Sequence, residues 1–136
     1  MMTPDEIKTT LAQNGYCIVP NILIPNEIEY CKNEFKTWQQ TIPNHDEVHR
    51  IINPHGIYKY HCVGHTRHAW FIRTRPSVQQ VFKDIWETDD LIVSFDGCCY
   101  ISKDTKTKDR CWTHTDQAPD KVGLKCYQGF VSLTEN

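Results

Sequence analysis

The sequence has no apolar run near the ~20 residues that a membrane-spanning helix needs, so we expect no membrane partner. Its first residues are polar and include Asp5 and Glu6, which is unlike a secretory signal. An excess of one charge is also missing. The net charge is −2 at pH 7, which gives no long-range attraction to nucleic acid. These absences favour a cytoplasmic protein without a nucleic-acid partner.

Internal repeats, linkers and low-complexity segments are absent too. The 39% hydrophobic and 24% charged residues are typical of a folded globular protein. A chain of 136 residues is long enough for one domain with a buried core, so we expect a single domain over residues 1–136. The seven cysteines are an odd number, and Cys98 and Cys99 are adjacent. Without a secretory signal, this pattern predicts reduced thiols rather than disulfides.

Three segments carry helix signals, each with a proline in its first turn. Thr3-Pro4-Asp5-Glu6 has the form of a capping box and predicts a helix that ends at Asn14-Gly15. Pro25 begins a second helix and Pro76 a third. Their apolar residues recur at intervals of three and four, the period of a buried helical stripe. The two stripes are Ile28, Cys31, Phe35, Trp38 and Ile42, and Val78, Val81, Phe82, Ile85 and Trp86.

The remaining segments read as short strands and polar loops. Alternation and turn residues predict strands at Tyr16–Val19, Leu91–Phe95, Cys98–Ile101 and Lys125–Leu133. Residues 43–54 and the charged stretch 103–110 read as loops. Helices thus come first and strands last, which indicates an α+β domain. Residues 1–90 form a mainly helical support region, and residues 91–136 hold the first strands of the core.

The strongest candidate for chemistry is Trp112-Thr113-His114-Thr115-Asp116-Gln117. In an extended chain, residues two apart point to the same face, so His114 and Asp116 can aim at one point. With one further His they would form the two-His, one-carboxylate triad of non-haem Fe(II) oxygenases. The pattern also arises by chance, and Asp116 can equally cap a turn with Gln117-Ala118-Pro119.

From about Gly56 onward the motif stands in a longer ordered pattern: Gly64-His65, Trp70, Ile72-Arg73, residues 81–86, Leu91–Gly97, Trp112–Gln117 and Cys126–Leu133. In this order and spacing the chain resembles the phytanoyl-CoA dioxygenase-like family. The resemblance implies a double-stranded β-helix (jelly-roll) core with the helices packed outside it. It also implies Fe(II) held by His114 and Asp116, with 2-oxoglutarate on the side of Tyr100 and Gln128. The implied reaction is dioxygenase hydroxylation of a small molecule, whose identity nothing in the sequence marks.

The chain departs from that family after the motif. The family has a second iron-binding His further on, followed by an Arg for the far carboxylate of 2-oxoglutarate. Here neither His nor Arg occurs after His114, and Lys121 and Lys125 are the cations that follow. The sequence therefore predicts the N-terminal portion of such an enzyme, C-terminally truncated. An incomplete jelly roll predicts self-association or pairing with a complementing C-terminal segment.

Two other functions remain open. A non-catalytic structural or interaction protein derived from the same fold would explain the missing His and Arg. A zinc-binding module could be drawn from the cluster His61, Cys62, His65 and His68, by pairing Cys62-x-x-His65 with Cys111-x-x-His114. Tyr58, Tyr60 and Trp70 interleave with that cluster, which favours packing over metal binding. Lys103, Lys106, Lys108 and Arg110 are diluted by Asp104 and Asp109 and read as a solvated loop.

Overall fold

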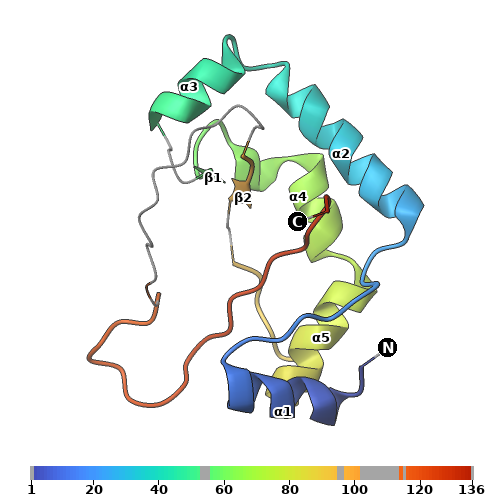
Figure 1. The fold of residues 1–136 in the computed structure, drawn as a ribbon, viewed down its shortest axis with the longest axis vertical. Helices are drawn as coiled ribbons and strands as arrows, with labels where there is room; N and C mark the ends of the chain where they lie inside the picture. Colours follow the sequence, from blue (N-terminus) through green and yellow to red (C-terminus); the bar gives the residue numbers. More distant parts are fainter. Residues whose placement is uncertain (1, 53–55, 95–96, 102–113, 115, 136) are drawn as a thin grey trace.

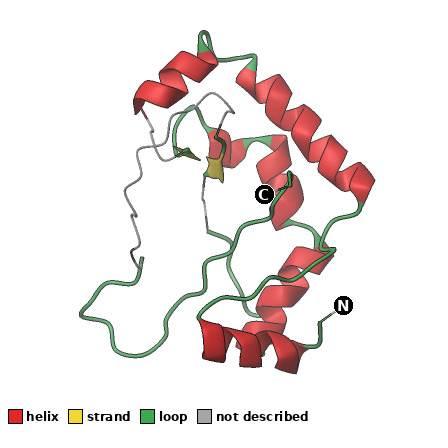
Figure 2. Cartoon of the chain, viewed as in Figure 1, coloured by secondary structure: helices red, strands yellow, loops and turns green. Residues whose placement is uncertain are grey.

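The computed structural model describes residues 2–52, 56–94, 97–101, 114 and 116–135 (Figure 1). These residues form mainly helices and one small antiparallel sheet (Figure 2), which confirms the α+β class. No helix in the described part is long and apolar enough to cross a membrane. The elements in chain order are α1 (Pro4–Asn14), α2 (Pro25–Gln39), α3 (His45–Ile52), β1 (Ile57–Tyr58), the 3-10 turn η1 (Val63–His65), α4 (Arg67–Arg73), α5 (Pro76–Trp86) and β2 (Cys98–Cys99).

Helix α1 begins and ends where the sequence predicts. The Thr3 hydroxyl accepts a hydrogen bond from the Glu6 amide at 3.3 Å, and the Glu6 carboxylate accepts one from the Thr3 amide at 2.7 Å. This reciprocal pair satisfies two amides that the first turn leaves unpaired. At the other end Gly15 adopts a φ of 77°, which closes the helix. Ile7 is 2% exposed and lies on a helix that packs against α5.

Helices α2 and α4 form the second packed pair. The predicted stripe on α2 is confirmed in part: Cys31 is fully buried and Ile42, just past the helix, is 7% exposed, whereas Ile28, Phe35 and Trp38 are half-buried. Tyr30 of α2 meets Phe71 of α4 with ring centroids 4.6 Å apart. Polar contacts tie the same region together: Glu27 pairs with Arg75 at 3.2 Å. Figure 1 shows α1 and α5 at one end of the molecule and α2, α3 and α4 at the other.

The predicted loop over residues 43–54 is wrong, because α3 lies inside it. Asn44 takes a φ of 52° and its carbonyl accepts from the amides of Glu47 and Val48, both at 3.0 Å. Asp46 and Glu47 then favour the positive end of the helix dipole. Helix α4 was not predicted either. Both helices are short. The buried face of α3 includes a histidine, which obscures its apolar spacing in the sequence.

Most of the predicted strands are absent from the described residues. The register pairs Ile57 with Cys99 and Tyr58 with Cys98, so Cys98–Ile101 is a strand only in part. Residues 16–19, 91–94 and 125–133 run without strand structure, whereas Phe95 is outside the described residues. Alternating side chains make a strand only where a neighbouring chain completes the ladder. Residues 125–133 instead pack on α5, with Tyr127 and Trp86 rings 5.1 Å apart.

Candidate functional site

The side chains of His114 and Asp116 converge, as their spacing predicts. His114 Nε2 lies 3.0 Å from Asp116 Oδ1. Both side chains are open to solvent, at 45% and 53% exposed respectively. The residues before them in the motif, Trp112 and Thr113, and Thr115 between them, lie outside the described residues.

The loop that follows brings a third polar side chain to the pair. The Gln117 amide group donates to the carbonyls of Lys121 at 3.1 Å and Gly123 at 2.7 Å, and its oxygen accepts from the Lys125 amide at 2.9 Å. One side chain thereby holds the loop 117–125 as it turns back (Figure 1). Beyond this loop, Gln128 Nε2 donates to Asp116 Oδ2 at 3.0 Å.

The alternative role predicted for Asp116 was to cap a turn with residues 117–119, and its contacts differ from that role. Among the described residues, its two carboxylate oxygens engage the side chains of His114 and Gln128. The residue that organises the turn is the neighbouring Gln117. Gln128 was predicted for the cosubstrate side, and the structure brings it to the same carboxylate.

The geometry of His114 and Asp116 fits two ligands of one metal ion. Ligands at about 2.1 Å from a metal and at right angles to each other are about 3.0 Å apart. The distance of 3.0 Å between His114 Nε2 and Asp116 Oδ1 has that value, and it also suits an N–H···O hydrogen bond in the metal-free protein. A neutral imidazole and a carboxylate suit Fe(II). No group of three metal-binding side chains occurs in the described residues, so the pair is a two-ligand set there.

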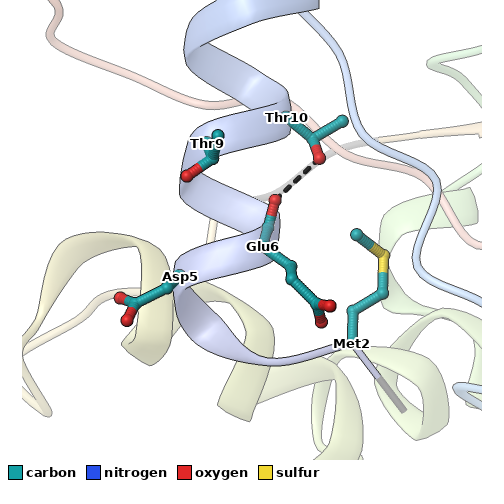
Figure 3. A pocket seen from close by; sticks show the side chains of 5 residues that line it. All are labelled: Met2, Asp5, Glu6, Thr9 and Thr10. Carbon is teal, nitrogen blue, oxygen red and sulfur yellow. Dashed lines mark hydrogen bonds between the residues drawn. The ribbon is translucent and has the colours of Figure 1, made fainter.

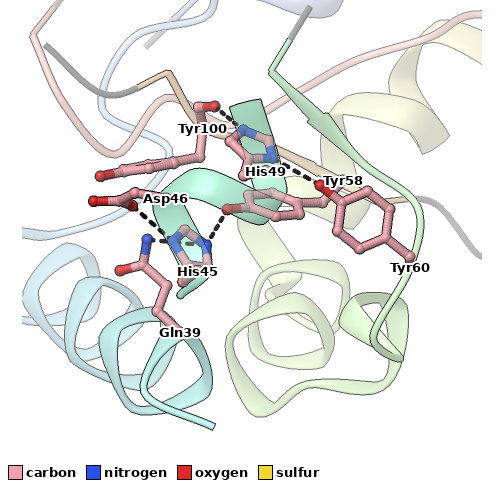
Figure 4. A network of polar contacts seen from close by, with 7 residues as sticks. All are labelled: Gln39, His45, Asp46, His49, Tyr58, Tyr60 and Tyr100. Carbon is pink, nitrogen blue, oxygen red and sulfur yellow. Dashed lines mark hydrogen bonds and ion pairs between the residues drawn. The ribbon is translucent and has the colours of Figure 1, made fainter. Parts of the chain in front are cut away.

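Tyr100, the other residue predicted for the cosubstrate side, belongs to a different cluster (Figure 4). Its carbonyl accepts a hydrogen bond from His49 Nε2 at 2.7 Å, and its ring packs 5.3 Å from Phe35. Its assignment to 2-oxoglutarate stays a prediction.

That cluster joins α3 to the small sheet through two histidine–tyrosine pairs. The Tyr60 hydroxyl bonds His49 Nδ1 at 2.9 Å, and the Tyr58 hydroxyl bonds His45 Nε2. His45 Nδ1 in turn lies 2.8 Å from the Asp46 carboxylate. Sequence reasoning missed this network. The signal was the i, i+4 spacing of two histidines beside alternating tyrosines.

The zinc alternative finds little support in the described residues. His68 is 2% exposed, and its Nδ1 lies 2.9 Å from the Thr66 hydroxyl, which itself donates to Val63 O at 2.7 Å. Burial, with Arg73 nearby, lowers the pKa of His68 to about 4. Cys62 is exposed on a backbone with a φ of 55°. Cys111, which the second zinc arm needs, lies outside the described residues.

The cysteines are thiols rather than disulfides wherever the structure describes them, as predicted. The six are Cys17, Cys31, Cys62, Cys98, Cys99 and Cys126. Burial raises the pKa of Cys98 to about 12 and also raises that of Cys99. Such thiols are weak nucleophiles at neutral pH. The adjacent pair is therefore a poor candidate for thiol chemistry.

An open hollow of about 460 Å³ lies along α1 (Figure 3). It is lined by Met2, Asp5, Glu6, Thr9 and Thr10. The Glu6 carboxylate is engaged by the capping box, and the Thr10 hydroxyl donates to the Glu6 carbonyl at 2.7 Å. Helix α1 itself thus engages the polar groups of Glu6 and Thr10.

The sequence is similar to the Ava biosynthesis cluster protein O of Aspergillus versicolor. The two are 30% identical over 134 residues, which cover 91% of this chain and 44% of the relative. The chain therefore spans less than half of that relative's length. No protein-family profile and no solved structure matches the chain.

Proposed function

We propose that this chain is part of a dioxygenase that depends on Fe(II) and 2-oxoglutarate, of the phytanoyl-CoA dioxygenase-like kind. The observation that carries the proposal is the convergence of His114 Nε2 and Asp116 Oδ1 at 3.0 Å. These two atoms are the iron ligands that the chain itself contributes. Bound iron would supply oxidative hydroxylation by activating dioxygen.

Gln128 has a positioning role in this proposal. By donating to Asp116 Oδ2, it holds the carboxylate plane and leaves Oδ1 directed toward His114. Partners of this kind fix a ligand's orientation and raise metal affinity. The Gln117-held loop delivers Gln128 to that place, so the loop is part of the site's support.

The name of the relative supports a proposal for the substrate class. This name places the relative in a biosynthesis cluster. We therefore propose a small-molecule biosynthetic intermediate as the substrate, hydroxylated at a C–H bond. The free thiols of the described cysteines fit a cytoplasmic location.

The proposal also requires a jelly-roll core, which the two-stranded sheet of the described residues does not form. The described residues supply no third iron ligand beside His114 and Asp116, and we propose that a second copy or a complementing segment provides it, together with a cation for the far carboxylate of 2-oxoglutarate. Three strongly exposed apolar side chains are candidate contacts for such a partner: Ile92 is 99%, Val122 88% and Phe130 87% exposed. Exposed apolar residues mark contact sites where they form a continuous patch.

Titration calorimetry with Mn(II) or Co(II) as redox-inert substitutes for Fe(II) tests the site. We expect weak binding to the chain, because two ligands do not close a coordination sphere. His114→Ala and Asp116→Ala should each abolish it. His65→Ala, which removes another exposed histidine, should leave it unchanged.

Gln128→Leu should weaken binding by about 10-fold or more without abolishing it, as loss of an orienting hydrogen bond does. Equal metal affinity in the wild type and His114→Ala would overturn the site assignment. A loss in His65→Ala as large as in His114→Ala would point to the zinc alternative.

A further inference from the structure

The buried histidine–tyrosine network of Figure 4 has the features of a redox-active tyrosine. Tyr58 has no exposed surface, and its hydroxyl bonds His45 Nε2. His45 is itself only 10% exposed in its side chain. This chemistry does not depend on whether His114 and Asp116 bind iron.

The partners of His45 fix which nitrogen carries its proton. The Asp46 carboxylate can only accept hydrogen bonds, so the proton lies on His45 Nδ1, which is 2.8 Å from Asp46 Oδ1. His45 Nε2 is then the lone-pair nitrogen. It faces the hydroxyl of Tyr58 and, at 3.4 Å, the amide nitrogen of Gln39, both of which can donate to it (Figure 4). The Tyr58 hydroxyl therefore donates to His45 Nε2, while His45 Nδ1 donates to the Asp46 carboxylate.

We propose that Tyr58 is a one-electron donor whose phenolic proton is taken up by His45. A one-electron oxidant withdraws one electron from the Tyr58 ring. The O–H bond breaks and an N–H bond forms at His45 Nε2, which leaves a neutral phenoxyl radical and an imidazolium. When a thiol reductant returns the electron, the proton returns to the phenolic oxygen and the pair is restored.

The surroundings favour this coupled step over loss of the proton alone. Burial raises the pKa of Tyr58, because a phenolate has no water to stabilise it there. Moving the proton and the electron together avoids a buried anion. The new imidazolium is compensated by the Asp46 carboxylate, to which it already donates.

Tyr60 is the internal comparison. Its hydroxyl also bonds an imidazole, His49 Nδ1, at 2.9 Å. However, the other ring nitrogen, His49 Nε2, donates to the neutral backbone carbonyl of Tyr100 at 2.7 Å. A positive charge on His49 therefore lacks the direct carboxylate contact that His45 has, and Tyr58 is the better donor of the two.

Neighbouring rings give an oxidant access to the buried phenol. Trp38 lies 5.1 Å and Tyr60 5.3 Å from Tyr58 between ring centroids. Both are partly exposed, whereas Tyr58 is not. An oxidant at the surface can thus draw the electron through these rings without contacting Tyr58.

Photogenerated ruthenium(III) tris-bipyridine is a suitable one-electron oxidant for the whole chain. Electron paramagnetic resonance of samples frozen after a delay would count the phenoxyl radicals that persist once exposed ones have decayed. We expect Tyr58→Phe to remove the persistent signal and Tyr60→Phe to retain it. Tyr16→Phe is the matched control, since Tyr16 is 65% exposed and its loss should affect the early signal alone.

Asp46→Asn provides a test that leaves Tyr58 in place. The Asp46 side chain is 73% exposed, so the change is compatible with folding. We expect the rate of radical formation to fall on the order of tenfold, because the imidazolium loses its adjacent charge. A persistent signal that survives in Tyr58→Phe, an equal loss in Tyr60→Phe, or an unchanged rate in Asp46→Asn would each overturn the assignment.

Discussion

Replacing His68 by glutamine should reduce the loss of stability that the protein shows on mild acidification. His68 is 2% exposed, its Nδ1 lies 2.9 Å from the Thr66 hydroxyl, and its ring meets Phe35 edge-on at 5.4 Å. An imidazolium in this place would be poorly solvated and would lie near Arg73. Burial, with Arg73 adding to it, therefore lowers the pKa of His68 to about 4, from the usual 6.5.

The direction follows from proton linkage. Because the folded-state pKa is lowered, the unfolded chain binds more protons between pH 6.5 and 4, and stability rises with pH across that window. The contribution is fully present above pH 6.5 and is lost as the pH falls toward 4. For these two pKa values, the change between pH 7 and pH 5 is about 2 kcal/mol.

Urea unfolding at pH 7 and pH 5, followed by circular dichroism, measures this difference. The wild type should lose about 2 kcal/mol more than His68→Gln over that interval. Glu6 and Glu87, whose hydrogen bonds to Thr3 and Lys8 lower their pKa values, also weaken in acid, but they are common to both proteins and cancel. Identical pH dependence in the two proteins would refute the inference that His68 is buried and neutral.

Two further predictions concern the proposed function. Light scattering should give an average mass above 16.0 kDa that rises with protein concentration. Phe130→Ser should reduce this mass, because Phe130 is 87% exposed. A monomer of constant mass at all concentrations would contradict the expectation of an incomplete fold. The isolated chain with Fe(II) should form no succinate from 2-oxoglutarate above the enzyme-free background. After His114 the sequence has no Arg to bind the far carboxylate of 2-oxoglutarate and no His to bind the metal. Iron-dependent succinate formation would mean that other residues supply these two roles.

The helices that could be predicted are those whose signals are local. The prolines at the starts of α1, α2 and α5, the Thr3–Glu6 capping box and the apolar spacing on α2 all act within a few residues. Helix α3 lacks a proline start, and the one buried residue on its described part is His49. The two buried ring nitrogens of His49 form hydrogen bonds to Tyr60 and Tyr100, which lie outside α3 in the sequence. The spacing of His45 and His49 beside Tyr58 and Tyr60 was a nearby signal, but Tyr100 lies 51 residues from His49, outside any window around α3.

Strands depend even more on remote partners. Residues 125–133 alternate as a strand should, yet they pack on α5 through Tyr127 and through Gly129, where an added Cβ would lie 3.2 Å from the Phe82 ring. The His114–Asp116 pair was predictable for the opposite reason. Two residues apart on an extended chain share a face by local geometry alone. The contribution of Gln128 needed the loop held by Gln117, which the sequence did not indicate.

The exposure of the His114–Asp116 pair connects the metal proposal with the association prediction. Side chains that are 45% and 53% exposed face water, whereas oxidative metal chemistry requires a dry and shaped cavity. Covering the pair requires protein surface beyond the residues described around it. Ile92, Val122 and Phe130 are exposed apolar side chains that such a cover could contact. A cover that also brings a third ligand would close the coordination sphere and raise metal affinity, so association and metal binding should strengthen each other.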